Sequence, residues 1–283
     1  MKVLVTGATG KLGELVVEAL LNKLPAGQIA VSVRDPKKAE RWTAAGVEVR
    51  YGDFDDEASL EKAFAGIDRL LIISTADFQH RLRQHTTAIR AAKKANVGFI
   101  AYTSAPNAAD SKLILAHDHR ETENVLKSSG VPYSILRNNW YLENEAGSFH
   151  AVLNGAPWAI ASGSGRVGWA TRRDYAEAAA NVLAGPGHEN TVYELSGEPL
   201  TQEQLASIFA EAMNREVQVV HMDDEAYGKM LLEVGMPEAV VPVFVDVQRG
   251  IRSGELAIES GDLLRLLGRP VTPLGDGIRE MLG

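Results

Sequence analysis

The chain has 283 residues, of which 45% are hydrophobic and 23% charged, which is ordinary for a globular protein. Its net charge of −8 argues against general binding of nucleic acid, which needs clustered Lys and Arg, and the absence of cysteine excludes disulfides, thiolate metal sites and a cysteine nucleophile. No apolar run approaches the roughly twenty residues of a membrane helix, so we expect a cytoplasmic monomer or homodimer that binds neither nucleic acid nor membranes.

The first predicted element is a buried strand at residues 3–5, followed by a glycine turn and a helix over residues 14–24. Gly7, Gly10 and Gly13 give the turn a G-x-x-G-x-x-G spacing. Glycine lets a backbone approach a pyrophosphate closely, and the N-terminus of the helix offers unpaired N–H groups to phosphates. The order of strand, glycine turn and helix therefore predicts a dinucleotide site. The alternative is a tight turn without a ligand.

Strands and helices then alternate as far as residue 137. The expected strands lie at residues 29–33, 47–51, 69–74, 98–103 and 133–137. The expected helices lie at residues 36–45, 59–64, 84–95 and 116–129. Such alternation is typical of an α/β fold, and it predicts a Rossmann-type, doubly wound parallel sheet with helices on both faces.

The pattern loosens after about residue 144, and we expect a smaller mixed C-terminal lobe for binding the substrate. Residues 147–168 are rich in glycine and small side chains, and two helices, around 174–184 and 201–213, precede a strand at 217–221. We therefore predict an NADP-binding Rossmann domain at residues 1–144. Residues 145–283 would be mostly substrate-lobe segments, with some elements packing back on the Rossmann sheet.

Arg34 follows the second strand, where an NAD enzyme usually has an acidic residue for the ribose 2′-hydroxyl. A guanidinium there would pair with a 2′-phosphate, and Lys37 and Lys38 add positive charge nearby. This favours NADP over NAD. The next residue, Asp35, keeps the NAD alternative open, because a shift of one residue at the strand end would place it on the ribose.

Two further strand ends are expected to line the cofactor. Asp53 could accept from the adenine amino group and Phe54 could flank the ring, although Asp53 could instead cap a turn. The small residues Ser74, Thr75 and Ala76 end the fourth strand and leave room for a ribose on the way to the nicotinamide.

Taken together, these residues resemble the NmrA-like family of atypical short-chain dehydrogenases. The resemblance covers essentially the whole chain, and it includes the turn at residues 6–13, Arg34, the Gly52-Asp53 corner, residues 100–104, His119 with Glu123, and residues 136–144. It implies binding of NADPH and reduction of a quinone or similar planar acceptor. The cofactor-binding residues that we predict are Thr6, Gly7, Ala8, Thr9, Gly10, Lys11, Leu12, Arg34, Asp53, Phe54, Ser74, Thr75, Ala76, Arg137, Asn138 and Asn139.

The chain lacks the Tyr-x-x-x-Lys pair of ordinary short-chain dehydrogenases, in which tyrosine is the acid. Alignment on Glu123 puts His119 in the lysine position and Leu115 in the tyrosine position. Because the family also contains proteins that bind the dinucleotide as a redox signal, an NADP(H) sensor is the alternative function. A reductase of another planar substrate, such as a triphenylmethane dye, is a third possibility.

Candidate catalytic residues lie at the ends of the fifth and sixth strands. Thr103, Asn138 and Tyr141 could donate hydrogen bonds to the oxyanion that forms when a quinone accepts hydride. They could also bind the nicotinamide carboxamide or cap a helix. His119 could relay a proton, but we favour a surface pair between His119 and Glu123 at the i, i+4 spacing.

Other aromatic and histidine residues have less specific interpretations. His117 and His119 point in different directions on a helix, so no metal site is predicted. Tyr102 is expected to pack within the sheet. Trp158 and Trp169 flank the glycine-rich segment, where they could line the acceptor pocket or belong to a mobile surface loop.

Overall fold

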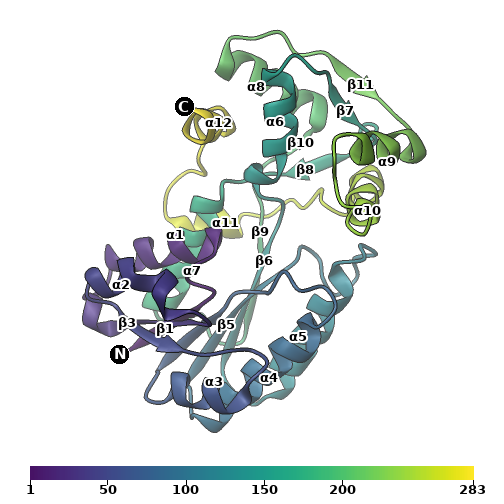
Figure 1. The fold of residues 1–283 in the computed structure, drawn as a ribbon. Coiled ribbons are helices and arrows are strands. Elements are labelled where there is room, and N and C mark those ends of the chain that lie inside the picture. The colour runs from purple at the N-terminus through teal and green to yellow at the C-terminus, as the bar shows by residue number, and fades with distance from the viewer.

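The computed structural model describes residues 1–283 and contains one large sheet, with a second lobe beyond the carboxyl ends of its strands (Figure 1). All seven strands of the large sheet are parallel. In spatial order they are β3 (Glu48–Tyr51), β2 (Ile29–Val33), β1 (Val3–Thr6), β4 (Arg69–Ile72), β5 (Phe99–Ser104), β6 (Tyr133–Asn138) and β9 (Thr191–Leu195). The order reverses between β1 and β4, which is where open α/β sheets bind ligands. The predicted Rossmann-type fold is confirmed.

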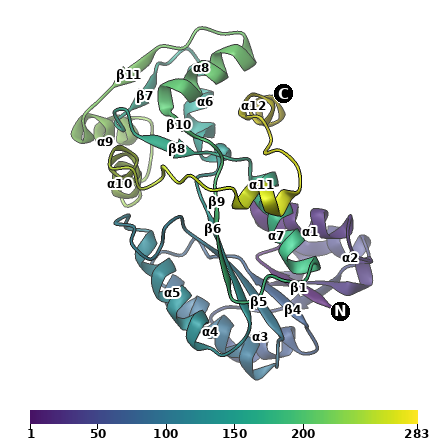
Figure 2. The same cartoon turned by 180° about the vertical axis from the view of Figure 1, so that it is seen from behind.

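Two layers of helices cover the sheet (Figures 1 and 2). One layer contains α1 (Lys11–Leu21), α7 (Arg172–Ala184) and α11 (Asp262–Leu267), with the short α2 (Glu40–Ala44) beside β3. The other contains α3 (Glu57–Phe64), α4 (Arg81–Lys94) and α5 (Ala116–Ser128). Alternate side chains of a strand point to opposite layers, so Val3 and Val5 pack with the first layer and Leu4 with the second. Burial on both faces explains why the central strands are continuous apolar runs.

The second lobe is formed by residues that lie mostly after 144. Its strands pair in twos: β7 (Trp158–Ile160) with β11 (Val219–His221), and β8 (Arg166–Gly168) with β10 (Pro199–Thr201). Its helices are α6 (Ala146–Leu153), α8 (Gln202–Met213), α9 (Asp224–Glu233), α10 (Val241–Arg252) and α12 (Leu274–Leu282). A separate apolar core holds it together, in which the ring of Phe149 stacks on Phe209 at 5.0 Å and meets Trp158 edge-on at 5.4 Å.

After residue 144, α7 packs beside α1, and β9 extends the large sheet next to β6. The structure differs from the expected elements at β9 and at residues 36–45. No strand was expected at β9, where Val192 is exposed at the edge of the sheet. The helix expected at residues 36–45 is a 3₁₀ turn (Pro36–Ala39) followed by α2, since the Asp35 side chain accepts a hydrogen bond from the Lys37 amide and tightens the start. None of the helices has the length and apolar character that a membrane span requires.

Glu145 is a carboxyl group buried in the core of the second lobe. It ends a 3₁₀ turn (Leu142–Glu145), and one of its oxygens accepts from the indole N–H groups of Trp140 and Trp169, each at 3.2 Å. Burial raises the pKa of Glu145 to about 7, although the two indole hydrogen bonds oppose that shift. The carboxyl is therefore largely protonated below neutral pH.

This raised pKa predicts a pH-dependent effect of Glu145→Gln. The stability that comes from protonating Glu145 in the folded state is fully present below pH 4.5, the ordinary pKa of glutamate. It is lost as the pH rises through 7. Glutamine stays neutral at every pH. The free energy of unfolding of Glu145→Gln minus that of wild type should therefore rise by about 2–3 kcal/mol between pH 5 and pH 8. Urea unfolding at the two pH values measures this change, and equal differences at both would contradict the buried, protonated state.

Candidate functional site

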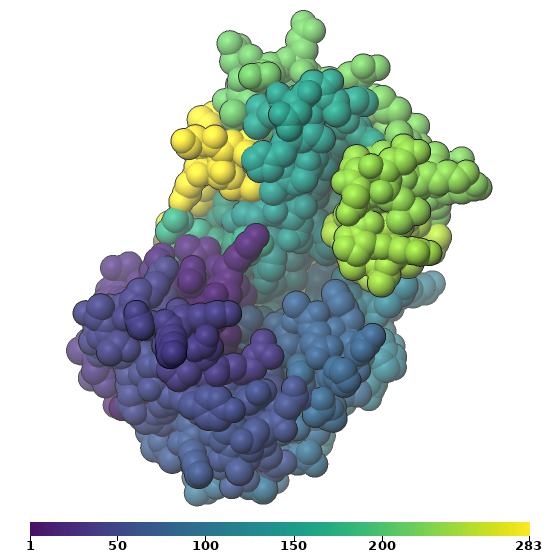
Figure 3. Space-filling model, viewed as in Figure 1, coloured from purple at the N-terminus to yellow at the C-terminus, as the bar shows by residue number.

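The carboxyl ends of β1 to β4 border a cavity of about 570 Å³, which we call the strand-end cavity. It is lined by Thr6, Gly7, Thr9, Gly10, Lys11, Leu12, Gly13, Ser32, Val33, Arg34, Gly52, Asp53, Phe54, Ile73, Ser74, Thr75, Ala76, Asp77, Gln84, Tyr141 and Arg172. The space-filling view shows the molecule hollowed between the purple and blue N-terminal part and the green second lobe (Figure 3). Most of the predicted cofactor-binding residues therefore lie around one cavity at the reversal of strand order.

Glycine is favoured at each of the three positions of the turn for a different structural reason. Gly7 has a φ of +64°, a left-handed conformation that favours glycine. A Cβ on Gly13 would lie 2.2 Å from the carbonyl oxygen of Gly7, so only glycine lets α1 pack this closely on the turn. Gly10 is the N-cap of α1, and a Cβ there would meet only the Gly7 oxygen, at 3.3 Å. Gly10 thus leaves room at the N-terminus of α1 for a ligand, while Gly13 is needed by the fold.

This difference predicts opposite outcomes for two glycine variants. Gly10→Val should fold with near wild-type stability but lose measurable binding of NADP(H), because its side chain would project into the strand-end cavity. Gly13→Ala should lower the free energy of unfolding by about 2–3 kcal/mol, because its methyl group overpacks the turn. Calorimetric titration and thermal unfolding of both variants measure these effects. An unfolded Gly10→Val or a fully stable Gly13→Ala would contradict the assignment.

Three cations face the strand-end cavity without a carboxylate partner in the chain: Lys11, Arg34 and Arg172. Lys11 begins α1, and Arg34 follows β2. The Arg172 guanidinium lies over the ring of Tyr141, 5.1 Å from its centroid. Three unpaired cations and a free helix N-terminus suit a polyanionic ligand. Asp35 does not line the cavity, since its carboxylate caps the following turn.

Asp53 and Phe54 both line the cavity, as expected for an adenine site. One carboxylate oxygen of Asp53 accepts from the amide of Asp55 at 3.0 Å, so the turn-capping alternative also holds. The other oxygen has no partner in the chain. Ala8 does not line the cavity: it is fully buried, and its carbonyl accepts from the indole of Trp42 at 3.0 Å.

The candidate hydrogen-bond donors at the ends of β5 and β6 form two separate contacts. The hydroxyl of Thr103 is buried, where it accepts from the Ser74 amide at 2.9 Å and ties the ends of β4 and β5. The amide nitrogen of Asn138 donates to the phenol oxygen of Tyr141 at 3.1 Å. Tyr141 alone of these candidates lines the cavity. Burial raises its pKa, so the phenol keeps its proton at neutral pH.

The expectation of a surface pair between His119 and Glu123 is wrong, because both side chains are buried. His119 Nδ1 instead forms a hydrogen bond with the hydroxyl of Tyr102 at 2.7 Å. Burial lowers the pKa of His119 to about 3, so it is neutral at physiological pH. Tyr102 packs within the sheet as expected, but it also carries this polar contact. His119 does not line the strand-end cavity.

Arg137 and Glu123 form the centre of a buried ion cluster at the carboxyl ends of β5, β6 and β9. Arg137 donates to both oxygens of Glu123 at 2.8 and 2.7 Å, and to Glu194 at 2.8 Å. Ser104 donates to Glu123 as well, at 2.7 Å. Burial would raise the pKa of Glu123, but the hydrogen bonds from Arg137 and Ser104 outweigh it and lower the pKa. The guanidinium of Arg137 is therefore occupied away from the cavity, where the sequence had suggested a cofactor contact.

Asn139 also lies outside the cavity lining. Its side-chain nitrogen donates to the hydroxyl of Ser196 at 3.1 Å and to the carbonyl of Leu256 at 3.0 Å. These contacts join the end of β6 to segments more than fifty residues later in the chain. We therefore interpret Asn139 as a connection between the large sheet and the second lobe.

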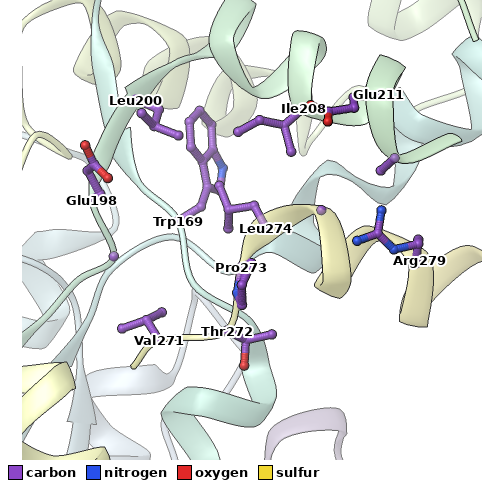
Figure 4. Close-up of a pocket in the computed structure, with 13 residues that line it drawn as sticks. Trp169, Glu198, Leu200, Ile208, Glu211, Val271, Thr272, Pro273, Leu274 and Arg279 are labelled. Atoms are coloured by element: carbon purple, nitrogen blue, oxygen red, sulfur yellow. The ribbon is translucent and has the colours of Figure 1, made fainter. Parts of the chain in front are cut away.

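The expectation that Trp158 and Trp169 belong to a mobile surface loop is wrong, since each is only 1% exposed in the core of the second lobe. Trp169 also borders a separate cavity of about 450 Å³ between α8, β10 and α12 (Figure 4). Leu200, Ile208 and Leu274 surround the indole there. This cavity shares no residue with the strand-end cavity.

Sequence reasoning missed several residues of the strand-end cavity. Gln84 enters it from α4 and Arg172 from the N-terminus of α7, both far from the glycine turn in the chain. A local signal existed for Arg172, because Thr171 caps α7 through the Asp174 amide and so places residue 172 in the first turn. No local signal indicated that this turn lies beside the start of α1.

Comparisons with known proteins agree with this geometry. The NmrA-like family model matches residues 1–251. Quinone oxidoreductase 2 of Escherichia coli is 41% identical over 278 residues, which cover 98% of this chain and 97% of that protein. The crystal structure of the NADPH-dependent quinone oxidoreductase of Escherichia coli complexed with NADPH has a TM-score of 0.96 at 40% identity, covering 99% of this chain and 100% of that chain. Triphenylmethane reductase of Citrobacter sp. complexed with NADP(H) has a TM-score of 0.95 at 36% identity over 100% of both chains.

Proposed function

Since the chain belongs to the NmrA-like family, we propose that it is an NADPH-dependent reductase that transfers hydride to a quinone or similar planar acceptor. The observation that carries this proposal is the strand-end cavity, where a glycine turn and three unpaired cations meet at the reversal of strand order. The structures that match the whole chain include a quinone oxidoreductase complexed with NADPH and a triphenylmethane reductase complexed with NADP(H), and their names support an aromatic or quinone acceptor.

The residues of the cavity divide among the parts of the cofactor. NADPH, when bound, supplies the hydride. Gly7, the residues from Thr9 to Leu12 and the N-terminus of α1 would hold the pyrophosphate, and Arg34 the 2′-phosphate. Asp53 and Phe54 would border the adenine, and residues 74–76 the nicotinamide ribose. Arg172 would add a positive charge from the N-terminus of α7.

Tyr141 is the group that we propose to face the acceptor. A quinone that accepts hydride becomes an oxyanion, and a hydroquinone anion needs a hydrogen-bond donor more than a strong acid. The phenol of Tyr141 accepts from Asn138, which leaves its own proton free to donate. Thr103 and Asn138 position Ser74 and Tyr141 through hydrogen bonds of 2.9 and 3.1 Å, and so act indirectly.

The second half of the chain would cover the acceptor. We retain residues 1–144 as the NADP-binding domain and residues 145–283 as mostly substrate-lobe segments, with α7, β9 and α11 packed on the large sheet. The partner is a small planar molecule, and we propose that the protein acts in the cytoplasm as a monomer or homodimer.

One assay tests the function. The purified protein is mixed with NADPH and a short-chain quinone, and the absorbance of the reduced nicotinamide is followed. Consumption only when protein and quinone are both present supports the reductase, and Tyr141→Phe should then lower kcat about 10-fold or more while the Kd for NADPH stays within about threefold. Tight binding of NADPH without turnover of quinones or triphenylmethane dyes would instead indicate an NADP(H) sensor. Turnover of a dye alone would indicate the dye as the acceptor.

A further inference from the structure

One face of α4 holds every polar atom of Thr75, a residue that lines the strand-end cavity. The carbonyl of Thr75 accepts from Arg81 Nε at 2.9 Å, and its hydroxyl donates to Gln84 Oε1 at 3.0 Å. Its backbone N–H donates to His85 Nε2 at 3.0 Å. Arg81, Gln84 and His85 stand at the i, i+3 and i+4 positions of one helix, which places them side by side.

These three polar side chains are almost completely buried. Arg81 is 6% exposed, Gln84 is 5% exposed and His85 is not exposed at all. Burying polar groups is costly unless they are hydrogen-bonded. The partner that all three side chains share is Thr75, which lies in a short segment without regular structure, residues 73–80. Gln84 also donates to Asp55. The helix therefore uses its buried polar face to shape this segment rather than to pack apolar side chains.

The orientation of His85 is determined by a chain of hydrogen bonds below it. Because Nε2 accepts from the Thr75 amide, the proton of the neutral ring is on Nδ1. That N–H faces the hydroxyl of Thr122 at 3.1 Å, which donates its own proton to the carbonyl of Asp118 at 2.7 Å. Tyr102 lies 3.3 Å from the same Nδ1. His85 can therefore only accept at the atom that faces Thr75.

We propose that Arg81, Gln84 and His85 form a positioning clamp that holds Thr75, and with it residues 73–76, in the shape that the nicotinamide half of the cofactor requires. This inference rests on the proposed function. Without the clamp, residues 73–76 would lose conformational entropy when the cofactor binds. Ordering them before binding lowers the entropic cost of binding. Arg81 and His85 are positioning residues, because neither lines the cavity, whereas Gln84 both lines the cavity and holds Thr75.

A matched pair of variants tests the clamp. In His85→Gln, the side-chain amide can place an oxygen where Nε2 stood, so the Thr75 amide keeps its acceptor. In His85→Asn, the shorter side chain reaches only the position of Nδ1, so that acceptor is lost. The loss of one neutral hydrogen bond corresponds to about fivefold to tenfold in an equilibrium constant. By calorimetric titration we expect the Kd for NADPH to rise about tenfold in His85→Asn and less than about threefold in His85→Gln.

Hydrogen exchange at the Thr75 amide gives a readout that does not depend on the cofactor. The amide should be protected in wild type and His85→Gln and exchange faster in His85→Asn, without a general increase over α4. Thr87→Val is the control, since Thr87 is a buried polar residue of α4 that bonds only its own helix, at the carbonyl of Arg83. It should leave both readouts unchanged.

The outcomes separate the clamp from the proposed function. If wild type does not bind NADPH, the proposed function fails, whereas Thr75 exchange still reports on the clamp. If wild type binds NADPH and both His85 variants bind it equally well, the positioning role is overturned. Should His85→Asn fail to fold, Gln84→Met removes the acceptor of the Thr75 hydroxyl, and an unchanged Kd for NADPH in that variant overturns the proposal as well.

Discussion

Arg34→Asp is expected to lower the preference for NADPH over NADH by about 100-fold or more. A charge-assisted pair with a phosphate contributes about 1.5–3 kcal/mol, and a carboxylate facing the phosphate adds repulsion. A change of 1.4 kcal/mol is tenfold in affinity. Arg34 is exposed, lines the strand-end cavity and has no carboxylate partner in the chain, so its substitution should not disturb the fold. The ratio of kcat/KM values for the two cofactors measures the effect.

Lys38→Asp is the matched control for Arg34→Asp. It makes the same charge reversal four residues away, but Lys38 does not line the cavity. Screening by salt limits the effect of such an exposed charge at a distance, so the cofactor ratio should change less than about threefold. If both variants shifted the ratio equally, general electrostatics rather than a contact by Arg34 would explain the preference for NADPH.

Arg137→Met is expected to lower the free energy of unfolding by about 3–5 kcal/mol, because removing one partner leaves Glu123 buried without its main counterion. The carboxylate of Glu123 is 1% exposed, and both of its oxygens accept from Arg137. Urea unfolding measures the loss. The Kd for NADPH of the folded variant should change less than about threefold, because Arg137 does not line the strand-end cavity.

A double variant separates the ion cluster from general packing. Arg137→Met with Glu123→Leu removes both charges, so it should be more stable than Arg137→Met alone. A loss below about 1 kcal/mol in the single variant would show that water reaches Glu123 and compensates it. If Arg137→Met were fully stable but bound NADPH weakly, the result would indicate that Arg137 contacts the cofactor, as the sequence had suggested.

The site could be predicted from the sequence wherever its residues are neighbours in the chain. The glycine turn, Arg34, Asp53 and residues 74–76 each follow a strand, and in a parallel sheet all such ends meet at one edge. The same reasoning failed for Arg137, near the end of strand β6, and for His119, on helix α5, because neither position indicated which side chain the residue would contact. Both partners are buried carboxylate or phenol groups from other elements.

Local patterns of apolar residues, glycine and proline predicted six of the seven strands of the large sheet and the position of the cofactor cavity, because these patterns act within one strand-turn-helix unit. Only the tertiary structure decided that Arg172 and Gln84 enter the cavity, that β9 joins the large sheet, and that α4 holds Thr75. Those outcomes depend on contacts between residues of separate elements. The partner of a side chain in another element does not change the periodicity or spacing of residues in the side chain's own segment, so the sequence of that segment does not indicate it.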